Sequence, residues 1–339
     1  MFELNKIALK IVSNNKGILA ADESIGTMTN RLDSINVKSN PENRLKFREA
    51  LFSASGMENF IGGVILFDET IKQSTISGKS IPELINQSGA IIGIKVDNGA
   101  KILAGSPEEK VTEGLDELRE RLIDYYKLGA KFTKWRAVYK ITEKYPSELA
   151  IKSNAHALAR YAALAQEANM VPIVEPEVLM DGNHDINKCY AVTAKVLKEC
   201  YKELNFHNVN LKGTILKPNM VLPGNKSKNK SSTEEIAKMT LKCLKENVPS
   251  EVPGIAFLSG GQTEIEATQN LNEINKINDT NFAMTFSYGR ALQQSALQYW
   301  GKNQNNITIT QKVFDHRAKM NSLSTSGRLT ENLDIFNIH

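Results

Sequence analysis

Cysteine and histidine are scarce in this chain of 339 residues, and their scarcity excludes several kinds of site. The three cysteines, Cys189, Cys200 and Cys243, lack the CxxC spacing of a zinc knuckle or a redox pair. Isolated cysteines in helical segments indicate free, buried thiols of a reducing compartment. The five histidines include no HExxH or HxxxH pair, so we expect no protein-bound catalytic metal.

Long apolar runs and a strong excess of one charge are also missing. No segment reaches the roughly 18–20 consecutive apolar residues that cross a bilayer. The net charge of +4 is too dilute for a nucleic-acid-binding face. At the N-terminus, charged residues interrupt an apolar helical face, which predicts an amphipathic surface helix instead of a signal peptide. That face consists of Leu4, Ile7, Ala8, Ile11 and Val12. We expect a cytoplasmic protein that binds neither membranes nor nucleic acid.

What the sequence contains is an alternation of short apolar runs and helical stretches. Runs with little internal alternation are typical of parallel strands buried on both faces. Eight such strands, each followed by a helix, predict a (β/α)8 TIM barrel of the α/β class better than an open doubly wound sheet. The runs are 17–24, 62–69, 90–97, 130–136, 171–177, 213–219, 254–261 and 283–290.

Helical periodicity predicts helices over 108–128, 147–168 and 233–247. We expect the first to open at Ser106, with Glu109 as its capping-box partner. The third follows a similar serine-to-glutamate start at Ser232.

The chain shows no linker between domains. Its only Gly-, Ser- and Asn-rich stretch, 223–232, lies between a strand and its own helix. We therefore expect residues 1–339 to form one domain, with barrel strands over about 17–290. C-terminal helices and a tail occupy about 291–339, and we expect the tail to be mobile from residue 318 onward.

Ionisable groups stand at the carboxyl end of almost every predicted strand. In a barrel, the loops after these ends converge around one pocket, where the active site lies. A charge in an apolar strand is costly unless it is paired or used, and structural ion pairs at the barrel mouth would also explain such charges. The groups are Asp22, Asp68, Glu69, Lys95, Lys134, Arg136, Glu175, Glu177, Lys217 and Arg290.

Lysine offers a nucleophile among these groups. Lys217 ends an apolar run, and a desolvated amine beside a second cation such as Lys134 becomes nucleophilic towards carbonyls. Glu175 and Glu177 are two residues apart in a strand, so both face one pocket and can supply an acid and a base, with Asp22 as a third carboxylate. A Schiff base at Lys217 fits this chemistry, although one carboxylate could simply pair with a neighbouring cation.

Glycine-bearing turns follow the seventh and eighth runs, the usual position of a barrel phosphate site. Glycine lets backbone N–H groups close on phosphate oxygens, and an arginine adds a charge-assisted contact. One such turn says little, but two at these positions predict a phosphate site. The residues concerned are Ser259, Gly260, Gly261, Ser287, Gly289 and Arg290.

Taken in order, ILAADES, GGVILFDE, GIKVD, KWR, VPIVEPE, LKPNM, FLSGGQ and TFSYGRALQ resemble the class I, Schiff-base fructose-1,6-bisphosphate aldolases, over about residues 5–320. The resemblance implies a metal-free, cofactor-free lyase of glycolysis and gluconeogenesis. Such an enzyme cleaves fructose 1,6-bisphosphate to dihydroxyacetone phosphate and glyceraldehyde 3-phosphate, and catalyses the reverse condensation. The resemblance also implies a homotetramer, while no motif identifies a cytoskeletal or surface partner.

Roles for single residues follow from the same resemblance. Lys217 matches the Schiff-base lysine, and Glu175 matches the general acid/base, with Glu177 as its carboxylate neighbour. Asp22 matches the aspartate that positions the C4 hydroxyl. Residues that set the pocket electrostatics or hold phosphate correspond to Lys134 and Arg136 in the centre, the two glycine-bearing turns at the C1 phosphate, and Lys95 and Arg31 at the other end of the substrate.

Some positions depart from the family pattern. Thr27 replaces a serine and keeps a hydroxyl, whereas Asn30 and Asn98 replace basic residues near the distal phosphate. Their loss would weaken binding there or alter the preference between sugars with one and two phosphates. Many animal members end in a tyrosine that assists proton transfer at C3, but this chain ends in His339, which we expect to be a disordered terminal residue.

Three other functions fit parts of this pattern. Another Schiff-base aldolase or a transaldolase would share Lys217 and the carboxylates but not the two phosphate elements. A metal-dependent aldolase is disfavoured by the scattered histidines. The alternative from a different class is a non-catalytic phosphate-sugar-binding or scaffold protein on the same barrel. The intact set of Lys217, Glu175 and Asp22 argues against it.

Overall fold

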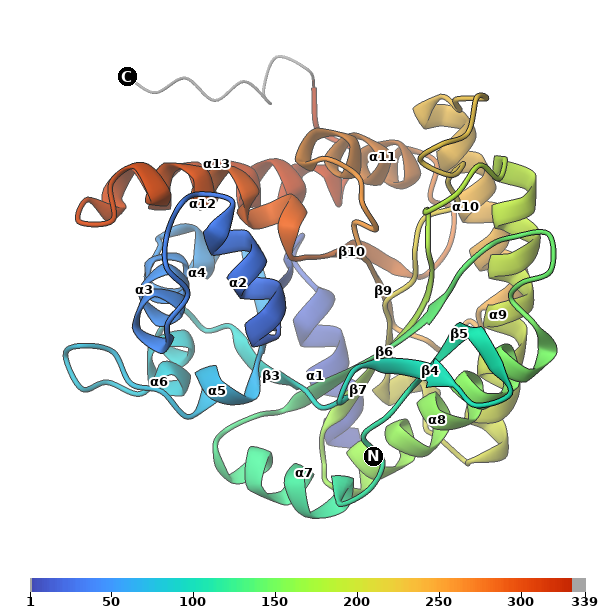
Figure 1. Ribbon diagram of the computed structural model, residues 1–339, viewed down its shortest axis with the longest axis horizontal. Coiled ribbons are helices and arrows are strands. Elements are labelled where there is room, and N and C mark those ends of the chain that lie inside the picture. The colour runs from blue at the N-terminus through green and yellow to red at the C-terminus, as the bar shows by residue number, and fades with distance from the viewer. Residues whose placement is uncertain (1, 331–339) are drawn as a thin grey trace.

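The computed structural model describes residues 2–330, in which eight parallel strands close into a barrel (Figure 1). The strand order around the barrel is β1-β10-β9-β8-β7-β6-β3-β2, and β1 pairs with both β10 and β2. Each strand overlaps one of the eight predicted runs, so the (β/α)8 barrel is confirmed. The strands are β1 (Gly17–Ala21), β2 (Ile61–Leu66), β3 (Ile91–Lys95), β6 (Phe132–Tyr139), β7 (Val171–Val178), β8 (Ile215–Leu216), β9 (Gly254–Phe257) and β10 (Ala283–Tyr288).

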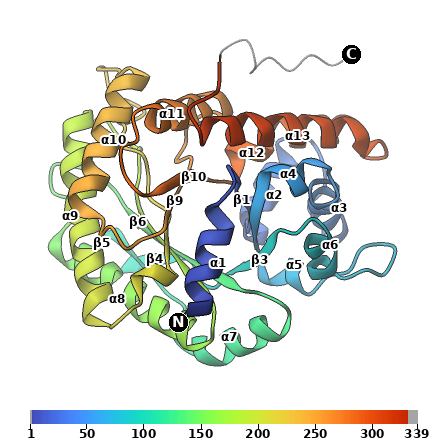
Figure 2. The same cartoon turned by 180° about the vertical axis from the view of Figure 1, so that it is seen from behind.

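Helices follow the strands and surround the barrel in both views (Figures 1 and 2). A serine cap starts α10, as predicted: Ser232 accepts from the N–H of Glu235. Ser147 caps α8 in the same way and accepts from the N–H of Ala150. The helices on the outside are α2 (Ile25–Asp33), α3 (Pro41–Phe52), α4 (Gly56–Phe60), α5 (Asp68–Ile71), α6 (Ile81–Gln87), α7 (Leu118–Lys127), α8 (Glu148–Glu167), α9 (Ile186–Phe206), α10 (Thr233–Asn247), α11 (Glu264–Lys276), α12 (Arg290–Lys302) and α13 (Ile307–Ser324), with a 3-10 turn at η1 (Leu211–Gly213).

The helices also bear on the expected absence of a membrane-spanning segment and on the expected state of the cysteines. Within residues 2–330, no helix combines the length and the apolar character needed to cross a bilayer. Cys189 and Cys200 on α9 and Cys243 on α10 are free and buried, as predicted.

The N-terminal helix α1 (Phe2–Val12) is amphipathic, as predicted, and closes the amino end of the barrel (Figure 2). Its apolar face packs in one cluster with residues from the barrel interior, including Phe132. Glycines at the starts of β2 and β9 allow this approach: a Cβ at Gly62 would lie 2.1 Å from the Ile11 carbonyl oxygen, and one at Gly254 would lie 2.7 Å from Val12. The apolar stripe therefore serves as a plug.

A β-hairpin replaces the first half of the helix predicted over 108–128. Strands β4 (Ala100–Leu103) and β5 (Ser106–Thr112) pair antiparallel, and helix α7 begins only at Leu118. Ser106 and Glu109 do hydrogen-bond, at 2.7 Å, but the Glu109 carboxylate also accepts from the backbone N–H of Ser147 at 2.8 Å. The serine-to-glutamate pattern therefore anchors the hairpin to the start of α8, a tertiary contact that the local sequence does not reveal.

The C-terminal region is ordered further than the sequence predicted. Residues 318–324 belong to α13, so the tail begins later than residue 318. The buried Asn321 side chain accepts a hydrogen bond from Thr268 at 2.7 Å, and the N–H of Leu329 donates to Asn272 at 2.9 Å. Amide side chains, which carry no apolar signal, hold this segment against α11. His339 and the rest of 331–339 lie outside the described residues.

A buried arginine ties α3 to the mouth of the barrel. Arg48, whose side chain is 1% exposed, donates to the Glu23 carbonyl oxygen at 2.9 Å and to the Thr70 hydroxyl at 2.8 Å. Its guanidinium also lies 3.5 Å from the Glu23 carboxylate. Next to it, Arg44 forms two hydrogen bonds with the carboxylate of Glu69. These contacts join α3 to the segments that follow β1 and β2.

We predict that Arg48→Met lowers the free energy of unfolding by about 3–5 kcal/mol, because it removes two hydrogen bonds to buried acceptors and the cation that faces Glu23 Oε2. The measurement is the guanidinium chloride midpoint followed by circular dichroism. Lys46→Met is the matched control, since Lys46 pairs with Glu42 on the exposed face of the same helix and should cost less than about 1 kcal/mol. Equal midpoints for the two variants would contradict this role of Arg48.

Candidate active site

The carboxyl ends of the barrel strands surround a cavity of about 900 Å³. Every residue that the sequence placed in the catalytic or substrate-binding set lines it. These residues are Asp22, Thr27, Arg31, Lys95, Lys134, Arg136, Glu175, Glu177, Lys217, Ser259, Gly260, Gly261, Ser287, Gly289 and Arg290.

Two of the charged strand ends point elsewhere. Asp68 accepts a hydrogen bond from the hydroxyl of Tyr125 at 2.8 Å, and Glu69 pairs with Arg44, so neither lines the cavity. Their expected place on the rim was wrong because the chain enters α5 directly at Asp68, and the helical turn redirects both side chains.

Strand pairing aligns the central charged groups. Residues two apart on a strand share a face, so Lys134 and Arg136 on β6 face the same side, as do Glu175 and Glu177 on β7. In the parallel ladder Arg136 lies opposite Glu175. Lys217 follows directly on β8, where its N–H bonds to the Val174 carbonyl oxygen at 2.8 Å. Backbone hydrogen bonds between the strands therefore fix the position from which each of these side chains enters the cavity.

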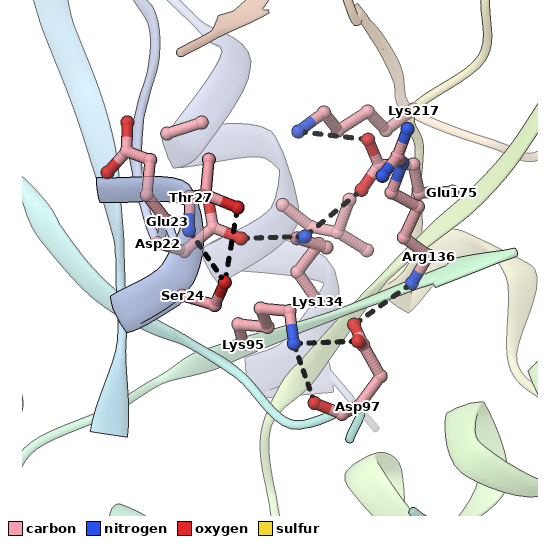
Figure 3. A network of polar contacts seen from close by, with 12 residues as sticks. Asp22, Glu23, Ser24, Thr27, Lys95, Asp97, Lys134, Arg136, Glu175 and Lys217 are labelled. Carbon is pink, nitrogen blue, oxygen red and sulfur yellow. Dashed lines mark hydrogen bonds and ion pairs between the residues drawn. The ribbon is translucent and has the colours of Figure 1, made fainter. Parts of the chain in front are cut away.

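Four of these side chains form a continuous chain of charges (Figure 3). Lys134 Nζ lies 2.6 Å from Asp22 Oδ2 and 3.4 Å from Glu175 Oε2. The other oxygen of Glu175 lies 3.3 Å from Lys217 Nζ. Lys134, Glu175 and Lys217 are each no more than 4% exposed. Glu175 thus lies between Lys134 and Lys217, and Lys134 also forms an ion pair with Asp22.

The electrostatics of this chain keep Lys134 and Asp22 charged. Burial by itself would raise the pKa of Asp22, but the positive charges of Lys134 and Lys217 outweigh it and lower that pKa from 3.8 to about 2. Burial opposes charge on Lys134 as well, yet Asp22 and Glu175 raise its pKa well above 10.5. At neutral pH Lys134 is therefore a fixed ammonium close to Lys217.

A second set of pairs surrounds this centre. Arg136 Nε donates to Glu177 Oε2 at 2.5 Å, and the Arg136 backbone N–H donates to Asp97 at 3.3 Å. Lys95 Nζ contacts Asp97 Oδ1 at 2.7 Å. Of the two adjacent glutamates, Glu177 is thus the one engaged by an arginine, which leaves Glu175 as the carboxylate beside Lys217. Glu177 therefore fits the expectation that one carboxylate pairs with a neighbouring cation, and Asp22 is paired with Lys134 in a similar way.

The predicted phosphate turns meet at one side of the cavity. Gly260 and Gly261 adopt φ values of +55° and +93°, a left-handed region that glycine occupies without strain. Arg290 is the first residue of α12, and it has no carboxylate within 4.0 Å among residues 2–330, unlike the other cations that line the cavity. The buried Ser287 hydroxyl also lacks a hydrogen-bond partner within that range. An anion here would meet an unpaired cation, a free hydroxyl and a helix N-terminus.

Arg31 lies closer to this turn than the sequence suggested. It was placed with Lys95 at the far end of the substrate, but its Nη2 atom is 3.7 Å from the position that a Cβ would occupy at Gly289. Its Nη1 atom pairs with Glu23 Oε1 at 2.5 Å. Arg31 therefore borders the predicted C1 phosphate turn, while Lys95 stands apart on β3 with Asp97.

Glu23, Asp97 and Gln293 are parts of the site that the sequence did not single out. Glu23 holds Arg31, and Asp97 holds both Lys95 and the Arg136 backbone. Their position at strand ends was an available signal. Gln293 donates to the Ala20 carbonyl oxygen at 2.8 Å and to Glu23 at 3.1 Å. It lies inside α12, where no sequence pattern distinguishes it.

The chain is similar to known proteins over almost its whole length. Residues 3–336 match the family model described as fructose-bisphosphate aldolase class-I. The chain is 52% identical to cytosolic fructose-bisphosphate aldolase 4 of Arabidopsis thaliana, over 96% of this chain and 83% of that protein. It is 51% identical to fructose-bisphosphate aldolase B of Gallus gallus, over 96% and 90%.

A solved structure has the same fold over almost its whole length. The fructose-bisphosphate aldolase of Plasmodium falciparum, solved in complex with TRAP and a small-molecule inhibitor, superposes with a TM-score of 0.96 at 45% identity, covering 97% of this chain and 95% of that one. Such agreement extends over almost the whole length of the barrel and its C-terminal helices. The chain belongs to the class I fructose-bisphosphate aldolase family and is a lyase.

Proposed function

We propose that this aldolase cleaves fructose 1,6-bisphosphate through a Schiff base at Lys217, with Glu175 moving the protons that the reaction requires. The observation that carries the proposal is the 3.3 Å contact between Lys217 Nζ and Glu175 Oε1, with both side chains almost fully buried. A nucleophile and a proton acceptor within reach of each other are what covalent catalysis needs. The products are dihydroxyacetone phosphate and glyceraldehyde 3-phosphate.

Formation of the imine would use this contact twice. Lys217 first passes one proton to Glu175; its neutral amine then attacks the C2 carbonyl, and a second nitrogen proton moves to the carbonyl oxygen, which gives a neutral carbinolamine. Glu175 then returns a proton to the carbinolamine hydroxyl, which leaves as water, and a protonated imine remains. Lys134, held in its charged form by Asp22 and Glu175, contacts the other oxygen of the same Glu175 carboxylate.

Carbon–carbon cleavage would follow from the charge on the imine. A carboxylate takes the proton of the C4 hydroxyl, the C3–C4 electron pair moves into the iminium, and the aldehyde leaves while an enamine remains. Protonation at C3 and hydrolysis then release the second triose. Glu175 is the base we assign to C4, and Asp22 is the positioning group, because a carboxylate with a pKa of about 2 accepts a hydrogen bond well but is a weak base.

The two phosphates would bind at different parts of the rim. The C1 phosphate fits the turn of Gly260 and Gly261 with Ser287 and Arg290, where the arginine has no other partner within the described residues. We assign the other phosphate to Lys95 on β3, and Thr27 on α2 also lines the cavity. Arg31 stands beside Gly289 and contributes to the C1 end.

Further properties of the enzyme rest on the family resemblance. We propose that catalysis needs no metal or other cofactor, because the iminium supplies the positive charge that a metal would supply. The chain would act as a single-domain subunit of a homotetramer. A cytoplasmic location agrees with the names of its Arabidopsis relatives, which are described as cytosolic.

Trapping of the imine tests the nucleophile directly. Borohydride added together with dihydroxyacetone phosphate should inactivate the enzyme permanently, because it reduces the imine to a stable secondary amine. Peptide mass spectrometry should then find the reduced triose on Lys217, while EDTA leaves the activity unchanged. Activity that survives reduction but is lost to the chelator would sink this proposal.

Replacement of the nucleophile gives an independent test. Lys217→Met should lower kcat by at least about 10³-fold, since the covalent route is lost, while circular dichroism remains that of the folded barrel. Lys212→Met is the matched control: Lys212 is exposed in the turn just before β8 and should keep full activity. Substantial turnover by Lys217→Met would move the nucleophile to another residue.

The role of Asp22 predicts a particular pH dependence. Its pKa is lowered to about 2, so it is ionised at any pH above about 3, and its titration cannot produce an acid limb in the pH profile of kcat between pH 5 and 9. Asp22→Asn should therefore lower kcat by about 10²-fold across that range without removing the limb. If the acid limb disappears in this variant, Asp22 is a titrating base and the assignment is wrong.

A further inference from the structure

Two histidines and a glutamate meet on the outside of the barrel, between α8 and α9. His156 lies on α8, Glu203 on α9, and His207 caps the end of α9. One ligand atom of each lies within 4.8 Å of those of the other two, and none of the three lines the active-site cavity. We propose that these side chains bind a divalent transition metal ion, with Zn²⁺ as the best match, outside the catalytic machinery.

The spacing of the ligands fits a tetrahedral ion. His156 Nδ1 lies 3.2 Å from Glu203 Oε2. Ligands held at about 2.0–2.2 Å from a tetrahedral zinc ion are about 3.3–3.5 Å apart, so an ion fits between these two atoms with little rearrangement. Two imidazoles and one carboxylate are a known zinc set with a fourth position for water. Calcium and magnesium prefer sets made of oxygen alone.

His207 is already oriented for this task. Its Nδ1 atom lies 2.9 Å from the backbone carbonyl oxygen of Glu203, and its ring centroid is 5.0 Å from that of His156. A metal-binding histidine usually donates its second N–H to such an acceptor, which fixes the ring and its tautomer. The same Nδ1 atom lies 3.7 Å from Glu203 Oε2, so a small rotation of the ring brings a His207 nitrogen to the ion.

The carboxylate of Glu203 is free to take part. The neighbouring Lys202 contacts Glu199 at 3.0 Å, and within residues 2–330 no lysine or arginine lies within 4.0 Å of Glu203. The site is also open to an entering ion, since the His156 side chain is 52% exposed while Glu203 and His207 are about one fifth exposed. These conditions favour a site that exchanges its ion with solvent.

Binding would link two helices that support the catalytic strands. Helices α8 and α9 pack against each other and follow β6 and β7, the strands that carry Lys134 and Glu175 (Figure 1). An ion shared by both helices stabilises the folded chain by mass action, because the unfolded chain does not hold the three ligands together. The ion is expected to raise Tm without taking part in the cleavage reaction.

Isothermal titration calorimetry of the full chain, stripped with chelator and free of any histidine tag, tests the proposal. Titration with zinc chloride should show one ion per chain with a micromolar Kd, and zinc should raise Tm. His156→Ala and Glu203→Gln should each weaken binding at least about tenfold and remove the shift in Tm. Magnesium at millimolar concentration should have no effect.

The controls separate this site from adventitious binding. Lys202→Ala changes an exposed neighbour on the same helix and should bind zinc like the parent. Because His156 is half exposed, His156→Ala should fold normally even if replacement of His207 disturbs the end of α9. Equal zinc affinity in the parent and His156→Ala, or no binding below about 1 mM in the parent (about −4.1 kcal/mol), would overturn the proposal.

Discussion

The buried ammonium of Lys134 is the charge on which the active site depends. A lone cation in the barrel mouth would be strongly destabilising, so Lys134 requires Asp22 at 2.6 Å and Glu175 at 3.4 Å. Lys134 lies on β6, Glu175 lies on β7 and Asp22 directly follows β1, so their attraction requires these three strands to stay in register. The same requirement leaves one oxygen of Glu175 facing Lys217 at 3.3 Å. Stability of the mouth and geometry of the proposed chemistry therefore rest on one set of contacts.

Outside this centre, most cations that line the cavity already form ion pairs with carboxylates before substrate binds. Glu23 holds Arg31, Asp97 holds Lys95, and Glu177 holds Arg136, so these side chains keep defined positions before substrate arrives. Such preorganisation lowers the entropy lost on binding. Arg290 differs, because no carboxylate of residues 2–330 lies within 4.0 Å of it, and a phosphate would be its natural partner.

The sequence predicted the barrel and the cavity because both follow from local patterns. These patterns are continuous apolar runs, each of which ends in a charged residue or in glycine. Prediction from sequence failed where a pattern has two structural uses. Ser106 and Glu109 match the pattern of a helix start but anchor a hairpin to α8. The apolar face of α1 predicted an amphipathic helix but did not show that this face closes the barrel. The meeting of His156 with His207 depends on helix packing and has no trace in sequence spacing.

Lys217 as the covalent partner of the substrate is the central claim, and isotope-edited NMR tests it most directly. Enzyme labelled with ¹⁵N at lysine Nζ is mixed with dihydroxyacetone phosphate labelled with ¹³C at C2. A one-bond coupling between C2 and a single lysine nitrogen is expected, and it should be absent in Lys217→Arg. A coupling that persists in this variant, or a C2 signal that stays that of a free ketone in the parent enzyme, would contradict the account.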